Sequence, residues 1–207
     1  MTVSVEFFYD LSSPYTHMAF HRIQPILAGK DVSVAWRPFL VGGVFNAVNQ
    51  TVYESRANMD HPKFKHAFVA LKDWAQEAGV PMNFPSPHHP VKSVAAMRFC
   101  CALEDRQEDL FRFSGAAFNA YFGDQRNLDD PAVLVEIADE IGLDGAALAA
   151  TAQTEEVKAT LRRNTEEVIE RGGYGSPTIF VDREHMYFGN DQLPLVEWRI
   201  AKLLSAD

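Results

Sequence analysis

The chain has 207 residues, of which 47% are hydrophobic and 12% aromatic, and it carries a formal net charge of −9 at pH 7. A chain of this length and apolar content can bury a large core, so intrinsic disorder is excluded. The acidic balance argues against nucleic acid and anionic membranes as partners, because both attract clustered Lys and Arg.

Neither a membrane span nor a secretion signal is visible in the sequence. No apolar run reaches the length of a transmembrane helix, and the N-terminal residues lack the basic and apolar regions of a signal peptide. We therefore expect a cytoplasmic protein. Its two cysteines, Cys100 and Cys101, are adjacent, a spacing that matches no zinc site. We expect both to be small core side chains and no metal to be bound.

The N-terminal part of the chain predicts a strand, a helix and a second strand. The strands are expected over 3–9 and 32–37, and the helix over 14–28. Two parallel strands joined by a helix form a right-handed βαβ unit. Ser13 is expected to cap the helix, with Pro14 in its first turn, where the missing N–H is harmless.

The middle of the chain is predicted to be mostly helical. Helices are expected over 62–78, 91–103 and 105–122, and further helices are expected to begin at Asp130, Asp144 and Thr154. The segment 80–90 contains four prolines and is expected to be an extended connector.

In the C-terminal part, the period of the sequence pattern changes back to two, as in strands. A strand is expected over 176–181, a hairpin partner over 186–188 and a closing helix over 191–204. The order βαβ, helical block, ββα predicts an α/β protein with a thioredoxin-like fold and a large all-helical insertion. We expect residues 1–41 and 173–207 to form the thioredoxin-like domain and residues 42–172 to form the helical insertion domain.

The turn at Ser13 is the first candidate for chemistry. A helix N-terminus favours an anion, and the Ser13 hydroxyl adds a donor for it. Thioredoxin-like proteins carry Cys-x-x-Cys at this turn, whereas here Ser13 and Thr16 stand at the two cysteine positions. The turn is therefore expected to hold the thiolate of a ligand. The alternative is that Ser13 only caps the helix.

Two further motifs stand near the C-terminus. In a thioredoxin-like arrangement, the proline that begins this strand faces the turn in the cis form, so we predict a cis bond at Ser176–Pro177. The backbone of Ser176 is then free to pair with an extended peptide. Asn190 and Asp191 precede the last helix, and they either cap it or hold the carboxylate and ammonium groups of a ligand.

Three segments carry a resemblance to a known family: FFYDLSSPYTHMA near the start, WAQEAGVPMNFP in the middle and GSPTIFVDREHMYFGNDQL near the end. Together they resemble the 2-hydroxychromene-2-carboxylate isomerase family over nearly the whole chain. The resemblance implies a kappa-class glutathione-transferase-like protein on the DsbA-like thioredoxin fold, with glutathione as its cofactor. Members of the family are often dimers, and the sequence itself does not indicate the oligomeric state.

The resemblance also assigns roles to individual residues. It implies that Ser13 is the catalytic serine, whose hydroxyl faces the glutathione sulfur, and that the backbone of Ser176 pairs with the cysteinyl part. Asn190 and Asp191 match the pair near the γ-glutamyl end. The implied glutathione-binding set is Ser13, Asn49, Ser176, Pro177, Asn190 and Asp191.

The chain departs from the family pattern on the expected substrate side. His66 and Ala70 stand where the family commonly has a tyrosine and an acidic residue on the helix that leads to Trp74, and Lys92 replaces a frequent asparagine. Substrate-side candidates are therefore His66, Trp74 and Lys92. Isolated histidines are usually surface or core side chains, and His66 is the best placed of them for acid–base work. Lys92 or Arg98 either receives a substrate carboxylate or is a solvated helix charge.

The implied function is a glutathione-dependent isomerase that acts on 2-hydroxychromene-2-carboxylate or a related aromatic-catabolism intermediate, by reversible thiolate addition. Alternatives are a kappa-like transferase that conjugates glutathione to hydrophobic electrophiles and a non-catalytic glutathione-binding module. A disulfide oxidoreductase needs a cysteine at the turn, and none is present there.

Overall fold

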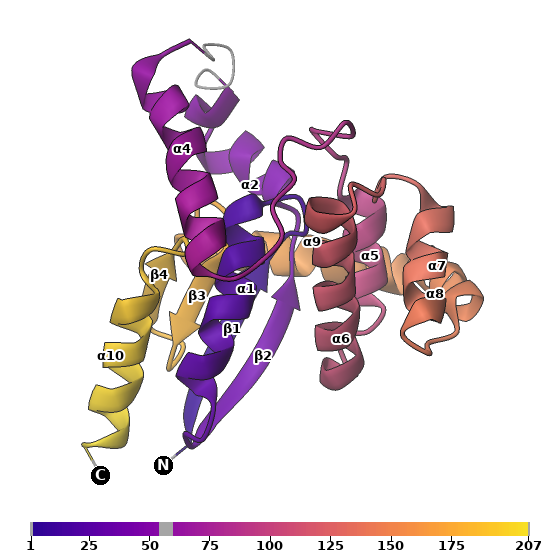
Figure 1. The fold of residues 1–207 in the computed structure, drawn as a ribbon. Coiled ribbons are helices and arrows are strands. Elements are labelled where there is room, and N and C mark those ends of the chain that lie inside the picture. The colour runs from indigo at the N-terminus through magenta and orange to yellow at the C-terminus, as the bar shows by residue number, and fades with distance from the viewer. Residues whose placement is uncertain (1, 54–59, 207) are drawn as a thin grey trace.

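The computed structural model describes residues 2–53 and 60–206, apart from the side chains of residues 63 and 64 (Figure 1). Its centre is one sheet. The strands are β1 (Val3–Tyr9), β2 (Val32–Pro38), β3 (Thr178–Val181) and β4 (His185–Phe188). Their order is β2-β1-β3-β4, with β1 parallel to β2 and antiparallel to β3. The sheet therefore joins the two ends of the chain.

Helices connect and cover the sheet. They are α1 (Pro14–Leu27), α2 (Val41–Val48), α4 (Pro62–Glu77), α5 (Val94–Cys101), α6 (Gln107–Phe118), the π-helix η1 (Asn119–Gly123), α7 (Pro131–Glu140), α8 (Gly145–Ala152), α9 (Glu155–Glu170) and α10 (Leu193–Leu204). In Figure 1, α4 projects above the sheet and α5 to α8 lie to one side of it. The predicted strands, helices and irregular connector are confirmed, except that the helix expected over 105–122 is α6 followed by the π-helix η1. The division into domains at residues 41 and 173 stays a prediction.

Helix α2 was not predicted. Its sequence, VGGVFNAV, holds two glycines and no acidic or basic residue, so it lacks the signals that mark a helix. The cap residue Leu40 supplies no side-chain hydrogen bond. Instead, the Val41 N–H donates to Asp10, which lies at the end of β1. A tertiary contact therefore supplies the cap.

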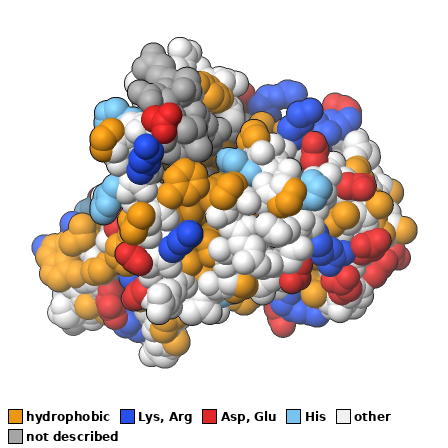
Figure 2. All heavy atoms as spheres, turned by 45° about the horizontal axis from the view of Figure 1, so that its top comes forward, with side chains coloured by type: hydrophobic (Ala, Val, Ile, Leu, Met, Phe, Trp, Pro, Cys, Tyr) orange, Lys and Arg blue, Asp and Glu red, His pale blue; other side chains and the backbone are white. Residues whose placement is uncertain are grey.

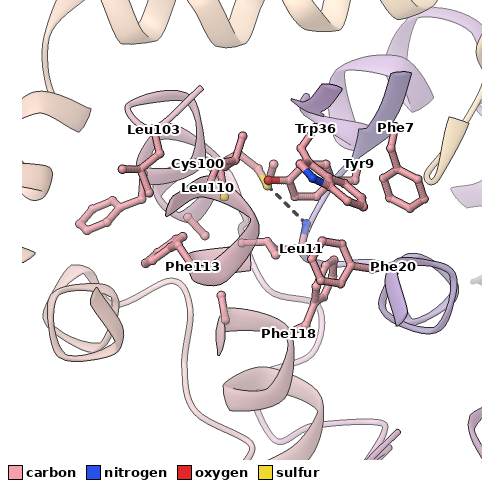
Figure 3. Close-up of a cluster of buried hydrophobic side chains, with 14 of the residues drawn as sticks. Phe7, Tyr9, Leu11, Phe20, Trp36, Cys100, Leu103, Leu110, Phe113 and Phe118 are labelled. Atoms are coloured by element: carbon pink, nitrogen blue, oxygen red, sulfur yellow. Dashed lines mark hydrogen bonds between the residues drawn. The ribbon is translucent and has the colours of Figure 1, made fainter. Parts of the chain in front are cut away.

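Both faces of β1 are buried. Phe7 and Tyr9 join the main core with side chains of α1, α5 and α6, as Figure 3 shows for the rings around Phe20 and Trp36. Phe8 points to the other face and packs in a cluster with residues of α2, α9 and β3. A strand covered on both sides holds the turn that follows it in a fixed place.

The adjacent cysteines are core residues, as predicted. Cys100 and Cys101 are both buried and free. Burial raises the pKa of the Cys100 thiol to about 12 and raises that of Cys101 as well. A thiol reacts as the thiolate, so neither side chain offers a nucleophile near neutral pH.

The described part of the chain contains no helix that combines the length and apolar character needed to cross a membrane. Within the same residues, no group of three or more His, Cys, Asp and Glu side chains is placed to hold a metal ion. Figure 2 shows hydrophobic side chains gathered in the centre of one face and acidic side chains toward its right-hand edge.

Candidate functional site

Ser13 and Ser176 meet at the N-terminus of α1. The Thr16 N–H donates to the Ser13 hydroxyl oxygen over 3.2 Å, so Ser13 caps the helix. The same hydroxyl donates to the backbone carbonyl of Ser176 over 3.1 Å. The Ser176–Pro177 bond is cis, which confirms the prediction. The turn after β1 therefore faces the start of β3, as the sequence predicted.

The Ser176 side chain stabilises this contact by two further hydrogen bonds. Its hydroxyl oxygen accepts a hydrogen bond of 2.9 Å from the Asp10 N–H and shares one of 2.8 Å with the Thr16 hydroxyl. The residue is 7% exposed. The side chain is therefore committed to the fold, and the backbone of Ser176 is the part that is left for a ligand.

Asp10 is a functional candidate that the sequence reasoning missed. It is fully buried and accepts hydrogen bonds from the Ser12 N–H, the Ser12 hydroxyl, the Val41 N–H and the Ser93 hydroxyl, all between 2.8 and 2.9 Å. Burial raises the pKa of this carboxyl, and these hydrogen bonds oppose the rise. Asp10 therefore joins the turn to the starts of α2 and α5. The only sequence signal was an acidic residue at the end of an apolar strand.

Asn190 and Asp191 lie in the loop between β4 and α10. The cap residue of α10 is Gln192, so the alternative that this pair caps the helix is wrong. Asn190 is buried. Asp191 is exposed, and its charge adds to burial in raising the pKa of Tyr15, which lies in the first turn of α1. The charge of Asp191 therefore acts on the N-terminal turn of α1, the helix that Ser13 caps.

Arg22 forms hydrogen bonds to this loop, and the sequence did not predict this contact. One nitrogen of its guanidinium donates to the Asn190 backbone carbonyl and to the Asn190 side-chain oxygen, over 2.8 and 2.7 Å. Its Nε lies 2.8 Å from a carboxylate oxygen of Glu77. The guanidinium also lies over the Trp74 ring, 4.6 Å from the centroid. Arg22 therefore connects α4 to the Asn190 loop, and half-buried Trp74 is part of that connection.

The remaining candidates are placed differently. The Asn49 amide donates to the Tyr174 carbonyl over 2.9 Å, so Asn49 lies beside the loop that leads to Ser176. His66 is exposed on α4. Among the described residues, His66 has no hydrogen bond or ion pair to Ser13 or Ser176. Lys92 is exposed and lines a cavity of about 320 Å³ that also touches Ser12.

His17, in the first turns of α1, is a core side chain. It is fully buried, its Nε2 lies 3.1 Å from the Pro81 carbonyl, and its ring stacks on Phe122 with centroids 5.1 Å apart. Burial and the neighbouring His21 lower the pKa of His17 to about 4. The ring is therefore neutral near pH 7 and is not available for acid–base work on a ligand.

Comparison with known proteins gives the family and the fold of the chain. The sequence pattern of the DSBA-like thioredoxin domain matches residues 4–201. The chain belongs to this family. Within it, this DSBA-like protein is 26% identical to a 2-hydroxychromene-2-carboxylate isomerase of Sphingobium xenophagum over 95% of its own length and 97% of that protein.

A second relative is named a kappa-class transferase. The DSBA-like protein is 26% identical to glutathione S-transferase kappa 2 of Caenorhabditis elegans, over 93% of its own chain and 89% of that one. Its fold matches a solved 2-hydroxychromene-2-carboxylate isomerase structure with a TM-score of 0.81 and 22% identity, over 97% and 96% of the two chains. The protein is thus related to both groups of enzymes, and the predicted fold class is confirmed.

Proposed function

We propose that the protein is a glutathione-dependent isomerase of 2-hydroxychromene-2-carboxylate or a related aromatic-catabolism intermediate. The observation that carries the proposal is the position of the Ser13 hydroxyl. It lies at the N-terminus of α1, 3.1 Å from the carbonyl of the residue before a cis-proline, with no cysteine at the turn. The relatives named as isomerases and kappa transferases support the choice of glutathione.

The tripeptide enters by an exchange of hydrogen bonds. Its cysteinyl N–H donates to the Ser176 carbonyl and replaces the Ser13 hydroxyl there. The Ser13 hydroxyl then donates to the glutathione sulfur. A hydrogen bond to a charged acceptor is worth about 1.5–3 kcal/mol, against about 0.5–1.5 kcal/mol for a neutral pair. The exchange therefore favours the thiolate form of the ligand over the thiol.

The site can supply the free energy that is needed to ionise the glutathione thiol near neutral pH. A free thiol with a pKa near 8.5 is about 3% ionised at neutral pH, and lowering that pKa by roughly 1.5 makes it about half ionised. This shift corresponds to about 2 kcal/mol, which a helix N-terminus and one charge-assisted hydrogen bond supply together. We assign the γ-glutamyl ammonium to the carboxylate of Asp191, whose charge acts on the first turn of the same helix, and Arg22 bonds to the loop that carries it.

The thiolate then acts as a recycled nucleophile. The chromene ring first opens: the bond between C2 and the ring oxygen breaks, the C2 hydroxyl becomes a ketone and its proton ends on the released phenol oxygen. The thiolate adds to the alkene carbon conjugated with this ketone, so a C–S bond forms and the double bond becomes single, with the electron pair moving to the ketone oxygen. Rotation about the single bond follows. The pair returns, the C–S bond breaks and the isomer leaves. Glutathione is regenerated, and no oxidant or reductant is needed.

A kappa-like transferase is the second candidate, because relatives with that name match over 93% of this chain. Both candidates use the same thiolate and differ in its fate. An isomerase leaves the amount of free glutathione constant through many turnovers, whereas a transferase consumes one molecule per product.

The experiment follows from this difference. The protein is given 2-hydroxychromene-2-carboxylate with and without glutathione, and isomer formation and free thiol are measured together. The proposal expects turnover that requires glutathione and leaves the thiol concentration unchanged. Loss of thiol in step with product favours the transferase, and equal rates without glutathione contradict both.

A further inference from the structure

The cavity beside Ser12 is walled mostly by apolar groups. It lies between the start of α2 and the end of the connector that leads into α5, and its volume is about 320 Å³. Phe45, Tyr53 and Val91 are among the residues that line it. Ligand pockets typically measure about 300–1,000 Å³, so this volume accommodates a compound of one or two rings.

The aromatic part of the wall is held in place. The Tyr53 hydroxyl donates to the Asn46 side-chain oxygen over 2.9 Å, and the Phe45 and Tyr53 rings meet edge to face with centroids 6.3 Å apart. Rings fixed in this way offer flat apolar surface to a planar ligand at little cost in conformational entropy.

The described residues that line the cavity include a positive charge and no negative one, whereas the whole chain is acidic. The chain has a net charge of −9, yet none of the described residues that line the cavity is Asp or Glu, and Lys92 is among them. Asp10, behind the wall, already accepts hydrogen bonds from Ser12, Val41 and Ser93. Lys92 itself has no carboxylate within ion-pair distance among the described residues. An exposed ammonium that forms no ion pair with any described residue, at the edge of an apolar cavity, is suited to an organic anion.

We propose that this cavity is the acceptor subsite and that Lys92 binds the carboxylate of a planar, unsaturated acid whose rings lie against Phe45 and Tyr53. This inference rests on the proposed function, because it takes Ser13 as the residue that holds the thiolate. Ser12 lines the cavity and precedes Ser13 directly, so the cavity adjoins the turn at which we place the sulfur.

The structure separates Lys92 from the other candidates of the substrate side. Arg98 is half-buried on α5 and does not line the cavity, and Trp74 lies under the Arg22 guanidinium. His66 does not line the cavity either. Lys92 is therefore a specificity-determining residue at the position where the chain departs from the family pattern.

The test uses binding as well as activity. Cinnamate, a planar unsaturated acid, and cinnamamide, its neutral counterpart of the same shape, are titrated calorimetrically into the wild-type protein and into Lys92→Met. The matched control is Lys202→Met, an exposed lysine in the last turn of α10. We expect wild type and Lys202→Met to bind cinnamate about tenfold more tightly than cinnamamide, and Lys92→Met to bind both alike. For the isomerisation of 2-hydroxychromene-2-carboxylate, Lys92→Met is expected to raise KM about tenfold with kcat nearly unchanged.

The possible results separate the two proposals. Equal binding of the acid and the amide by wild type, or an unchanged preference in Lys92→Met, overturns the assignment of Lys92. If Lys92→Met loses the preference for the acid but glutathione gives no thiolate absorbance with wild type, the glutathione mechanism fails and the anion subsite stands. If the thiolate forms and Lys92→Met behaves as wild type in both assays, only the subsite is wrong.

Discussion

The Ser13 hydroxyl and the Ser176 carbonyl lie 3.1 Å apart, although 163 residues separate them in the chain. One is a donor at the start of a helix and the other is an acceptor next to the sheet, and each satisfies the other. A peptide with an N–H and a sulfur at the right spacing replaces both halves of this bond. The donor and the acceptor of this hydrogen bond are therefore the two groups that the proposed ligand site offers to glutathione.

Replacing Ser13 by alanine removes the donor to the sulfur. We expect Ser13→Ala to lower kcat by about 10–100-fold, the effect of losing one hydrogen bond to a charged group, with little change in glutathione affinity. The change also removes a helix cap, which costs about 1 kcal/mol of stability. Thr154→Ala removes the cap of α9 in the same way and is the matched control. Equal activity of the two variants would contradict the role of Ser13.

Asp10 is expected to be needed for the fold of the site. In Asp10→Asn the amide nitrogen meets N–H and hydroxyl donors that the carboxylate now accepts. We expect the free energy of unfolding in urea to fall by about 2–4 kcal/mol, because buried donors lose their acceptor. Asp130→Asn is the control, since Asn caps a helix as well as Asp and the Asp130 carboxylate accepts one exposed N–H. A loss below about 1 kcal/mol in Asp10→Asn would show that the network tolerates an amide.

His17 is expected to make the fold sensitive to acid. The pKa is lowered to about 4 in the folded protein from 6.5, so the unfolded chain binds more protons between these values. The contribution is fully present above pH 6.5 and is lost as the pH falls through about 4, and its size is roughly 3 kcal/mol. His17→Phe keeps the ring stack on Phe122 and is expected to flatten this dependence, measured by urea unfolding at several pH values. His66→Phe, the same substitution at an exposed histidine, is the control, and a pH dependence in His17→Phe as steep as in wild type would contradict this role of His17.

Arg22 is expected to act on the glutathione site through the Asn190 loop. Arg22→Met keeps an unbranched side chain of similar length and removes both hydrogen bonds to Asn190, together with the guanidinium contacts to Trp74 and Glu77. We expect glutathione to bind about 3–30-fold more weakly, because the loop that carries Asp191 loses its fixed position. Calorimetric titration measures this. The control is Arg126→Met, which breaks surface ion pairs with Glu136 and Glu140, and a loss of the same size there would remove the argument.

The sequence predicted the parts of this protein that depend on local pattern. The strand before Ser13, the proline at N1 of α1 and the strand that begins after Pro177 are local signals, and the fold class follows from their order. The cis bond at Pro177 was predicted from the thioredoxin-like arrangement and is confirmed.

The parts that were missed depend on contacts between distant segments. The partners of Asp10 come from positions 12, 41 and 93, and no spacing in the sequence brings them together. Arg22 reads as an ordinary helix charge, yet it contacts both Glu77 and Asn190. Helix α2 was missed for the same reason, because its cap is supplied by Asp10 from another segment.

The central claim is that the Ser13 turn stabilises the thiolate of bound glutathione. The most direct measurement is the ultraviolet thiolate absorbance of glutathione as a function of pH, with wild type and with Ser13→Ala. The account predicts that wild type lowers the pKa of the bound thiol by roughly 1.5 and that Ser13→Ala loses most of this shift. A bound thiol that titrates like free glutathione in the wild-type protein would contradict it.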